Sequence, residues 1–355
     1  FRQRSRLPVQ GGIDMLLAKL SEAGGISGQE AEVRALIRSE ITPYVDEIKV
    51  DPIGNLIAVK RGRKGNRRVM LAAHMDEVGL MVVGIDSDGL LHVEAAGGVD
   101  PRVLVSKLVY VGADRRPGVI GSKPIHLLKA EDMDRATDMD SLYVDIGAKN
   151  KDDAEKLVKL GDQIIFATRC EPLGEGFLKG KAMDDRVGCY AIIEALKKQH
   201  DFDLIGAFTV QEEVGLRGAG VAAYQVHPDL ALVLEGTTAH DVTETPEHGF
   251  STVPGRGPAI VYRDASWVGD RRIVDRLIET AEAAGVPYQI KRTVTGGTDA
   301  GRIGPTESGV PVAVMSMPCR YIHSPVSVIC ADDLNNYVKL AGLFLDSLDE
   351  RGLPV

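Results

Sequence analysis

Residues 69–77 read Val-Met-Leu-Ala-Ala-His-Met-Asp-Glu, and this segment decides how the chain folds. Its first five residues, Val69 to Ala73, form an uninterrupted apolar run, which is typical of a β-strand buried on both faces. His74 and Asp76 follow at the carboxyl end of the run, where open α/β sheets collect their ligands. Because they are two residues apart, their side chains share one face if the strand continues. The segment therefore predicts a central strand with an imidazole and a carboxylate at the ligand-binding edge of a sheet.

Helical and strand-like segments alternate in the rest of the chain. Apolar residues recur at the i, i+3, i+4, i+7 spacing of amphipathic helices in 189–196, 274–281 and 334–341, and strand-like runs occupy 203–210, 230–234, 259–262 and 312–316. Near the N-terminus we expect helices at 14–23 and after Ser27, which forms a capping box with Glu30, and two short strands within 48–59. This alternation predicts an α/β fold with a mixed, mostly parallel sheet and helices on both faces.

The pattern changes between Val78 and Phe166. Short β-like runs at 79–85, 90–94, 107–112 and 142–146 are separated by glycines, and helical periodicity returns only at 152–160. We therefore expect residues 78–166 to form an inserted β-rich domain, which divides the α/β domain into the segments 1–77 and 167–355.

The composition excludes several classes of protein. The 355 residues suffice for about two domains, and the formal net charge of −9 argues against a nucleic-acid-binding protein, which would carry a basic face. No apolar run approaches the ~18 residues that a membrane span needs, and residues 1–10 lack the apolar centre of a secretory signal. The four cysteines contain no C-x-x-C pair, which favours buried free thiols in a reducing compartment and hence a cytoplasmic protein.

Two pairs of carboxylates stand next to predicted elements. Asp184-Asp185 open the helix at 189–196 after a glycine-rich approach, although aspartate is also the ordinary cap of a helix N-terminus. A carboxylate held at this turn is able to bridge two cations. Glu212-Glu213 follow a predicted strand, and two carboxylates in a buried place need a cation or a shared proton. One member of such a pair can bind a metal while the other accepts a proton from water.

Glu235 ends the strand-like run 230–234, and His323 follows the segment 317–322. Each of them alone suits a structural role better than a functional one. With the other motifs they complete a set of three carboxylates and two imidazoles at the ends of predicted sheet elements. Such a set leaves positions open for water and substrate on two divalent cations, which is typical of a catalytic metal site. Thr298-Asp299 suits a helix cap, with a role near the substrate as the weaker alternative, and His126 stays ambiguous.

The order of these motifs resembles that of the M42 metallo-aminopeptidases, a family of glutamyl aminopeptidases and TET-type enzymes once also labelled cellulase-like. The matching stretches are 73–77 (Ala-His-Met-Asp-Glu), 121–126 (Gly-Ser-Lys-Pro-Ile-His), 143–147 (Tyr-Val-Asp-Ile-Gly), 180–186 (Gly-Lys-Ala-Met-Asp-Asp-Arg), 211–215 (Gln-Glu-Glu-Val-Gly), 296–300 (Gly-Gly-Thr-Asp-Ala) and 321–325 (Tyr-Ile-His-Ser-Pro). They follow the family's order over almost the whole chain, which is more specific than any single motif.

The resemblance implies a two-metal aminopeptidase that uses zinc or cobalt. In the family's pattern Asp184 bridges the metals, His74 and Glu235 complete one ligand set, and Glu213 and His323 complete the other. Glu212 would be the general base, and Asp76 the partner that orients His74. The inserted domain would mediate dimerisation, and dimers would build twelve-subunit tetrahedral shells that trim short peptides.

Two positions depart from the family's pattern, and two other functions stay open. Position 235 is usually aspartate, where this chain has Glu235, and Ser327 stands where an acidic residue is common. A deacylase of N-acyl amino acids is the nearest alternative. A non-catalytic assembly protein with the same fold is the alternative from another class. Neither the preferred N-terminal residue of the substrate nor the native metal follows from the sequence.

Overall fold

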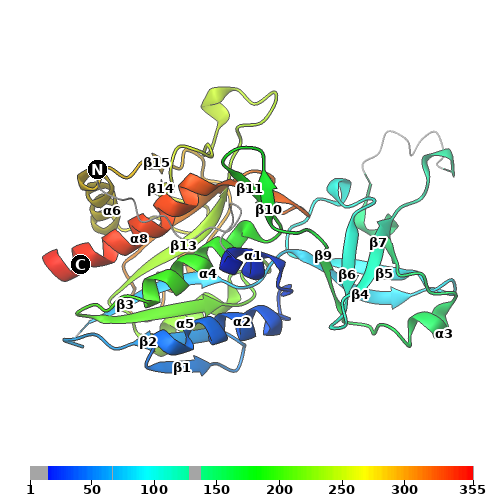
Figure 1. The fold of residues 1–355 in the computed structure, drawn as a ribbon, viewed down its shortest axis with the longest axis horizontal. Coiled ribbons are helices and arrows are strands. Elements are labelled where there is room, and N and C mark those ends of the chain that lie inside the picture. Colours follow the sequence, from blue (N-terminus) through cyan, green and yellow to red (C-terminus); the bar gives the residue numbers. More distant parts are fainter. Residues whose placement is uncertain (1–14, 66, 128–136, 355) are drawn as a thin grey trace.

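The computed structural model describes residues 15–65, 67–127 and 137–354 (Figure 1). Residues 1–10, whose composition predicts no secretory signal, and Asp14, the expected start of the first helix, lie outside these ranges. None of the helices within them is both long and apolar enough to cross a membrane.

An eight-stranded mixed sheet forms the centre of the larger part of the molecule (Figure 1). Its strands, in spatial order, are β1 (Glu47–Val50), β2 (Leu56–Lys60), β12 (Asp203–Thr209), β3 (Arg68–His74), β13 (Leu230–Thr238), β16 (Val312–Cys319), β14 (Ala259–Val261) and β15 (Gln289–Ile290). The central strands β12, β3, β13 and β16 are parallel to one another, whereas β2 and β14 join them antiparallel. The mixed α/β sheet predicted from the alternation of segments is confirmed.

Strand β3 is covered on both faces, as its apolar run predicts. Val69, Leu71 and Ala73 pack into one apolar core, and Met70 and Ala72 into the other, because successive side chains of a strand point to opposite faces. All five are at most 1 % exposed. The first core also contains residues of α1 (Met15–Glu22), α2 (Ala31–Ile41), α4 (Met183–Leu196), α6 (Arg271–Ala283) and α8 (Ala331–Arg351), and the second contains residues of α5 (Arg217–Val226) and α7 (Ala300–Ile303). Helices therefore cover both faces of the sheet.

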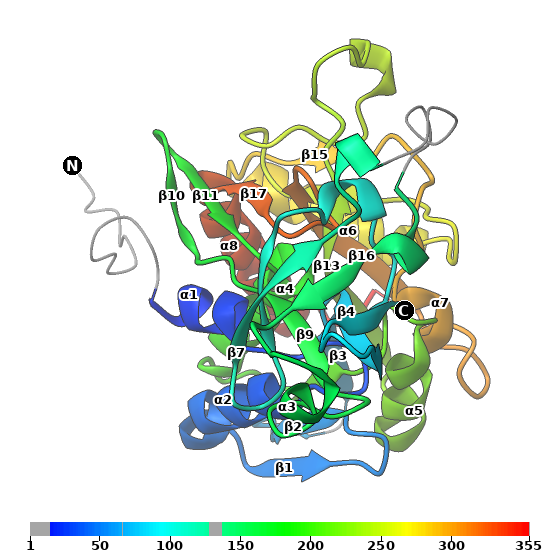
Figure 2. The same cartoon turned by 90° about the vertical axis from the view of Figure 1, so that its right-hand side faces the viewer.

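A separate closed barrel is formed by strands between Gly79 and Phe166 (Figures 1 and 2). Its strands are β4 (Gly79–Ile85), β5 (Leu91–Ala96), β6 (Leu108–Val111), β7 (Arg116–Gly121), β8 (Tyr143–Asp145) and β9 (Gln163–Phe166), all paired antiparallel. The expected β-rich texture is thus present as a barrel with its own apolar core. The helix expected at 152–160 is wrong in length, because α3 is the single turn Lys151–Ala154. Irregular turns follow it, in which the N–H of Val158 donates to the carbonyl of Ala154 at 3.0 Å and the Val158 side chain joins the barrel core.

A three-stranded sheet links the glycine-rich approach to α4 with the segment after His323. It consists of β10 (Glu171–Leu173), β11 (Phe177–Gly180) and β17 (Ser327–Cys330), and Ser327 pairs with Gly180. Short 3-10 helices are η1 (Thr42–Tyr44), η2 (Pro101–Val103), η3 (Ile125–Leu127), η5 (Met139–Ser141) and η6 (Glu247–Gly249). The four cysteines are buried free thiols, as the lack of a C-x-x-C pair indicates.

A buried ionic cluster ties the start of α4 to the segments after α1 and β3. Glu77 accepts hydrogen bonds from Nζ of Lys181 at 2.6 and 2.7 Å, and Nη2 of Arg186 lies 3.4 Å from the same carboxylate. Lys181 and Arg186 also donate to the carbonyl of Ala23, just after α1. All three charged residues are at most 1 % exposed, and burial lowers the pKa of Lys181 to about 8. Each buried cation therefore depends on Glu77 as its counter-charge.

Replacing Glu77 with glutamine should destabilise the protein by about 3–5 kcal/mol, because it leaves buried cations without their counter-charge. The exposed pair Glu279–Arg351 supplies the control, since Glu279→Gln should cost about 1 kcal/mol or less. Differential scanning calorimetry at pH 7 measures both effects as shifts of Tm. Equal shifts for the two variants would contradict a stabilising role for the buried cluster.

Candidate metal centre

The predicted ligands meet at the carboxyl ends of the parallel strands. They are His74 at the end of β3, Glu235 in β13, Glu213 after β12, His323 after β16 and Asp184 in the first turn of α4. Together with Glu212 they line one cavity of about 480 Å³. Segments far apart in the sequence come together here because β12, β3, β13 and β16 are parallel neighbours, so their carboxyl ends share one edge of the sheet.

The carboxylate of Asp184 lies between two imidazoles. Its Oδ1 is 3.2 Å from Nε2 of His74, and its Oδ2 is 3.6 Å from Nε2 of His323. Each imidazole nitrogen also faces a second carboxylate at 3.2 Å, Oε1 of Glu235 for the first and Oε2 of Glu213 for the second. Burial alone would raise the pKa of Asp184, but hydrogen bonds from the two imidazoles outweigh it and hold this pKa well below its usual range. The two oxygens of Asp184 thus serve two imidazole–carboxylate pairs.

The other carboxylates of the cavity are buried, as in Glu235, or half-buried, as in Glu212 and Glu213, without enough positive charge around them. Burial raises the pKa of Glu213 to about 7 and that of Glu235 to about 8, and it raises the pKa of Glu212 well above its usual value. Oε2 of Glu235 has no hydrogen-bond partner within the described residues. Divalent cations would supply the missing positive charge, and zinc accepts both imidazole nitrogens and carboxylate oxygens as ligands. The donor set therefore fits two cations, one next to each imidazole.

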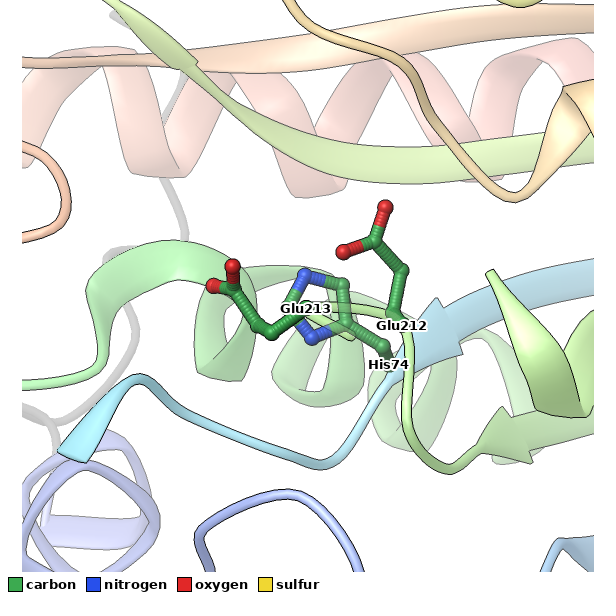
Figure 3. A group of neighbouring side chains, drawn as sticks. All are labelled: His74, Glu212 and Glu213. Carbon is green, nitrogen blue, oxygen red and sulfur yellow. The ribbon is translucent and has the colours of Figure 1, made fainter. Parts of the chain in front are cut away.

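Three groups of residues in this region could each hold a metal ion, because the potential ligand atoms within each group lie within 4.8 Å of one another. They are Asp184–Glu213–His323, His74–Glu212–Glu213 and His74–Asp185–Glu235. Figure 3 shows the second group, with the carboxylates of Glu212 and Glu213 on either side of the His74 ring. Asp185 is not among the predicted ligands, and its oxygens are occupied by the backbone N–H groups of His74 at 3.2 Å and Gly188 at 3.0 Å. It holds the end of β3 against α4.

Asp76 is fully buried and holds the Glu212-Glu213 segment. Its Oδ1 accepts the backbone N–H of Glu212 at 3.0 Å, and its Oδ2 accepts that of Glu213 at 3.1 Å. The hydroxyl of Ser27 donates to the same Oδ2 at 2.6 Å. Nδ1 of His74 lies 3.0 Å from the backbone carbonyl of Asp76 but 3.6 Å from its carboxylate. The main chain of Asp76 therefore orients His74, while its side chain positions the two glutamates.

Two expected helix caps are not formed. Glu30 rather than Ser27 immediately precedes α2, and its carboxylate accepts the N–H of Gly28 at 2.6 Å. Asp299 precedes α7 but makes no capping hydrogen bond, and its Oδ2 accepts the hydroxyl of Thr209 at 2.5 Å. Both cap predictions are wrong because Ser27 and Asp299 find buried partners on distant segments.

Lys291 also lines the cavity, although no sequence motif indicates it. A lone lysine between β15 and a glycine-rich turn belongs to no motif, so only the folded chain reveals it. Of the ambiguous candidates, Thr298 lines the cavity, and His126 lies outside it, in η3. Ser327 is buried in β17.

Most of the chain matches a known family. The family model of the M42 glutamyl aminopeptidases covers residues 54–340. The chain belongs to the M42 peptidase family. Among its relatives, lysyl aminopeptidase of Pyrococcus furiosus is 36% identical over 345 residues, which is 94% of this chain and 96% of the relative.

Solved structures of TET peptidases share the fold over most of their length. A TET aminopeptidase from the marine sediment archaeon Thaumarchaeota archaeon SCGC AB-539-E09 superposes with a TM-score of 0.91 at 36% identity, covering 94% of this chain and 96% of the other. The TET1 peptidase of Pyrococcus horikoshii superposes with a TM-score of 0.82 at 35% identity, covering 92% and 97%. The α/β sheet and the barrel are therefore both parts of a fold already seen in TET aminopeptidases.

Asp76→Asn should weaken divalent-metal binding by about 10- to 100-fold, because an amide N–H group replaces an oxygen that accepts a backbone N–H of the Glu212-Glu213 segment. Ser27→Ala removes only one hydrogen bond from the same carboxylate and should weaken binding by less than about tenfold. Calorimetric titration of the metal-free variants with zinc measures both affinities. Unchanged affinity in Asp76→Asn would show that the segment is held without this carboxylate.

Proposed function

We propose that this M42 protein is a dinuclear metallo-aminopeptidase that removes N-terminal residues from short peptides. The observation that carries the proposal is the position of Asp184, whose two oxygens face two separate imidazole–carboxylate pairs. A carboxylate with one ligand pair on each side suits two cations rather than one. The aminopeptidase names of the family and of its P. furiosus member support the reaction class.

Each cation would have three protein ligands. His74, Glu235 and Oδ1 of Asp184 would hold one, and His323, Glu213 and Oδ2 of Asp184 would hold the other. Three ligands leave positions open for water and substrate, and zinc and cobalt both accept mixed imidazole and carboxylate donors. When bound, such cations lower the pKa of water and polarise a peptide carbonyl.

The glutamate at position 235 keeps the ligand type of the family's aspartate. Its Oε1 lies 3.2 Å from Nε2 of His74, so the longer side chain still brings an oxygen to the imidazole. Its second oxygen, buried and unpaired within the described residues, is available to a cation as well. The departure at this position therefore leaves the proposed ligand set complete.

Glu212 is the proposed general base. Its carboxylate lines the cavity, and none of the described residues forms a hydrogen bond or ion pair with it. This free carboxylate faces the space where water and substrate would lie, so it is able to accept a proton there. Glu212 would take the proton from the attacking water and return it to the amine that leaves when the peptide C–N bond breaks.

We also propose that the barrel, within residues 78–166, mediates dimerisation, that dimers build a dodecamer, and that the segments on either side of the barrel form the catalytic domain. The P. horikoshii TET1 peptidase assembles into a tetrahedron or a large octahedral shell. Val83, Leu108 and Leu160 give the barrel exposed apolar surface for a subunit contact. Light scattering coupled to gel filtration measures the oligomeric state of the protein. A mass of twelve subunits supports the assembly, and a monomer contradicts it.

Substrates with and without a free amine separate the proposed function from its alternatives. After loading with zinc or cobalt, the protein should hydrolyse short peptides with a free N-terminal amine and leave their N-acetylated counterparts intact. A deacylase of N-acyl amino acids would show the reverse preference, and a non-catalytic assembly protein would hydrolyse neither. Chromatography of the products distinguishes these outcomes.

Glu212→Gln should fold and bind metal but lose about 10²- to 10⁴-fold in kcat, because a glutamine side chain cannot accept the proton. Glu175→Gln, on the exposed turn between β10 and β11, is the matched control and should keep the wild-type kcat. Both variants are compared at equal metal content, measured by mass spectrometry. Nearly full activity of the Glu212 variant would rule out its role as the base.

A further inference from the structure

Among the described residues, one lysine lines the cavity of the candidate metal centre. Lys291 follows β15, and its Nζ donates one hydrogen bond, to the backbone carbonyl of Thr295 at 2.9 Å. A lysine ammonium has three donors, so two of them have no protein acceptor in the described part of the chain. Lys291 also forms no ion pair with the carboxylates of the described residues.

The positive charge of Lys291 is partly withdrawn from water. The residue is half-buried, and burial lowers its pKa although nearby carboxylates, Asp264 first among them, act in the opposite direction. Asp264 is itself occupied, because Oδ2 accepts the hydroxyl of Thr298 at 2.8 Å and Oδ1 the N–H of Ser266 at 2.6 Å. A partly desolvated cation without a counter-ion is costly, and an anionic ligand would remove that cost.

The charge balance of the cavity makes Lys291 a surplus positive charge. The lining contains four carboxylates, which are Asp184, Glu212, Glu213 and Glu235. Two divalent cations, as proposed above, would offset these four negative charges while the imidazole ligands stay neutral. Lys291 then adds a positive charge that no other described residue of the lining offsets. The α-amino group of a peptide substrate is itself positive, so the counter-charge has to come from elsewhere in the substrate.

The rest of the lining suits a side chain with an aliphatic stem and a charged end. Leu216 and Ile322 offer apolar surface to methylene groups, and Gly296 and Gly297 add no side chains to the space. We propose that Lys291 binds the side-chain carboxylate of an N-terminal glutamate or aspartate, so that the protein selects peptides with an acidic N-terminal residue.

This selectivity rests on the aminopeptidase function proposed above. Family membership leaves it open, because the names of M42 proteins include both glutamyl and lysyl aminopeptidases, whose substrates carry opposite charges. The local charge of the cavity favours the acidic substrate, since an N-terminal lysine would place a second cation beside Lys291.

The sharpest test compares substrates that differ in charge but not in shape. L-Glutamyl- and L-glutaminyl-4-nitroanilide are such a pair, and neither has a C-terminal carboxylate that Lys291 could bind instead. With the full chain loaded with zinc or cobalt, we expect kcat/KM to be about 10- to 100-fold higher for the glutamyl substrate, the usual contribution of a charge-assisted hydrogen bond. The difference should lie mainly in KM, because the contact is made to the bound substrate and not to the reacting bond.

Variants at position 291 assign the preference to this side chain. Lys291→Met keeps the aliphatic stem and should bring kcat/KM for the two anilides to within about threefold of each other. Lys291→Glu should reverse the charge preference and favour L-lysyl-4-nitroanilide over the glutamyl substrate. Arg292→Met is the matched control, since the neighbouring residue is exposed and lines a different cavity. It removes the same positive charge and should keep the wild-type ratio of kcat/KM between the glutamyl and glutaminyl anilides.

Binding provides a readout without turnover. In calorimetry the metal-loaded protein should bind free L-glutamate more tightly than L-glutamine, and Lys291→Met should abolish this difference. Equal kcat/KM for the two anilides in the wild type, or an unchanged ratio in Lys291→Met, overturns the selectivity while the aminopeptidase function stands. Failure to cleave any substrate with a free amine overturns both.

Discussion

The buried carboxylate of Asp184 is the constraint on which the rest of the site depends. Both of its oxygens face an imidazole, and each imidazole faces one further carboxylate. Burial raises the pKa of Glu213 to about 7 and that of Glu235 to about 8, and the negative charge of Asp184 acts in the same direction. Bound cations would relieve this cost, so in the proposed centre the negative charge of the cavity would be balanced by ions and not by the protein.

The fold brings each proposed ligand from a different element. Buried charged side chains hold the loops that carry these ligands. Neighbouring parallel strands bring His74, Glu213, Glu235 and His323 to one edge of the sheet. Asp76 accepts the backbone N–H groups of the Glu212-Glu213 segment, and the ionic cluster around Glu77 anchors the chain that leads into Asp184. Loop ligands are therefore held by buried charged side chains, whose hydrogen bonds are far more costly to break than those of an exposed loop.

Local patterns predict the parts of the structure whose causes are local. The apolar run 69–73 predicts a strand buried on both faces, and polar residues directly after strand ends, such as His74, predict the site because parallel strands end at one edge. Contacts between residues far apart in the sequence cannot be predicted from such local patterns. Ser27 bonds to a buried carboxylate instead of capping a helix, the expected helix at 152–160 gives way to the barrel core, and Lys291 enters the cavity without any motif. The order of the strands and the closure of the barrel likewise depend on pairing between distant segments.

Anomalous X-ray diffraction from crystals of the zinc-loaded protein, recorded at the zinc absorption edge, tests the two-metal assignment most directly. The account predicts two peaks per subunit, one between His74 and Glu235 and the other between His323 and Glu213, with Asp184 bound to both. A single peak, or two peaks that Asp184 does not join, would contradict it.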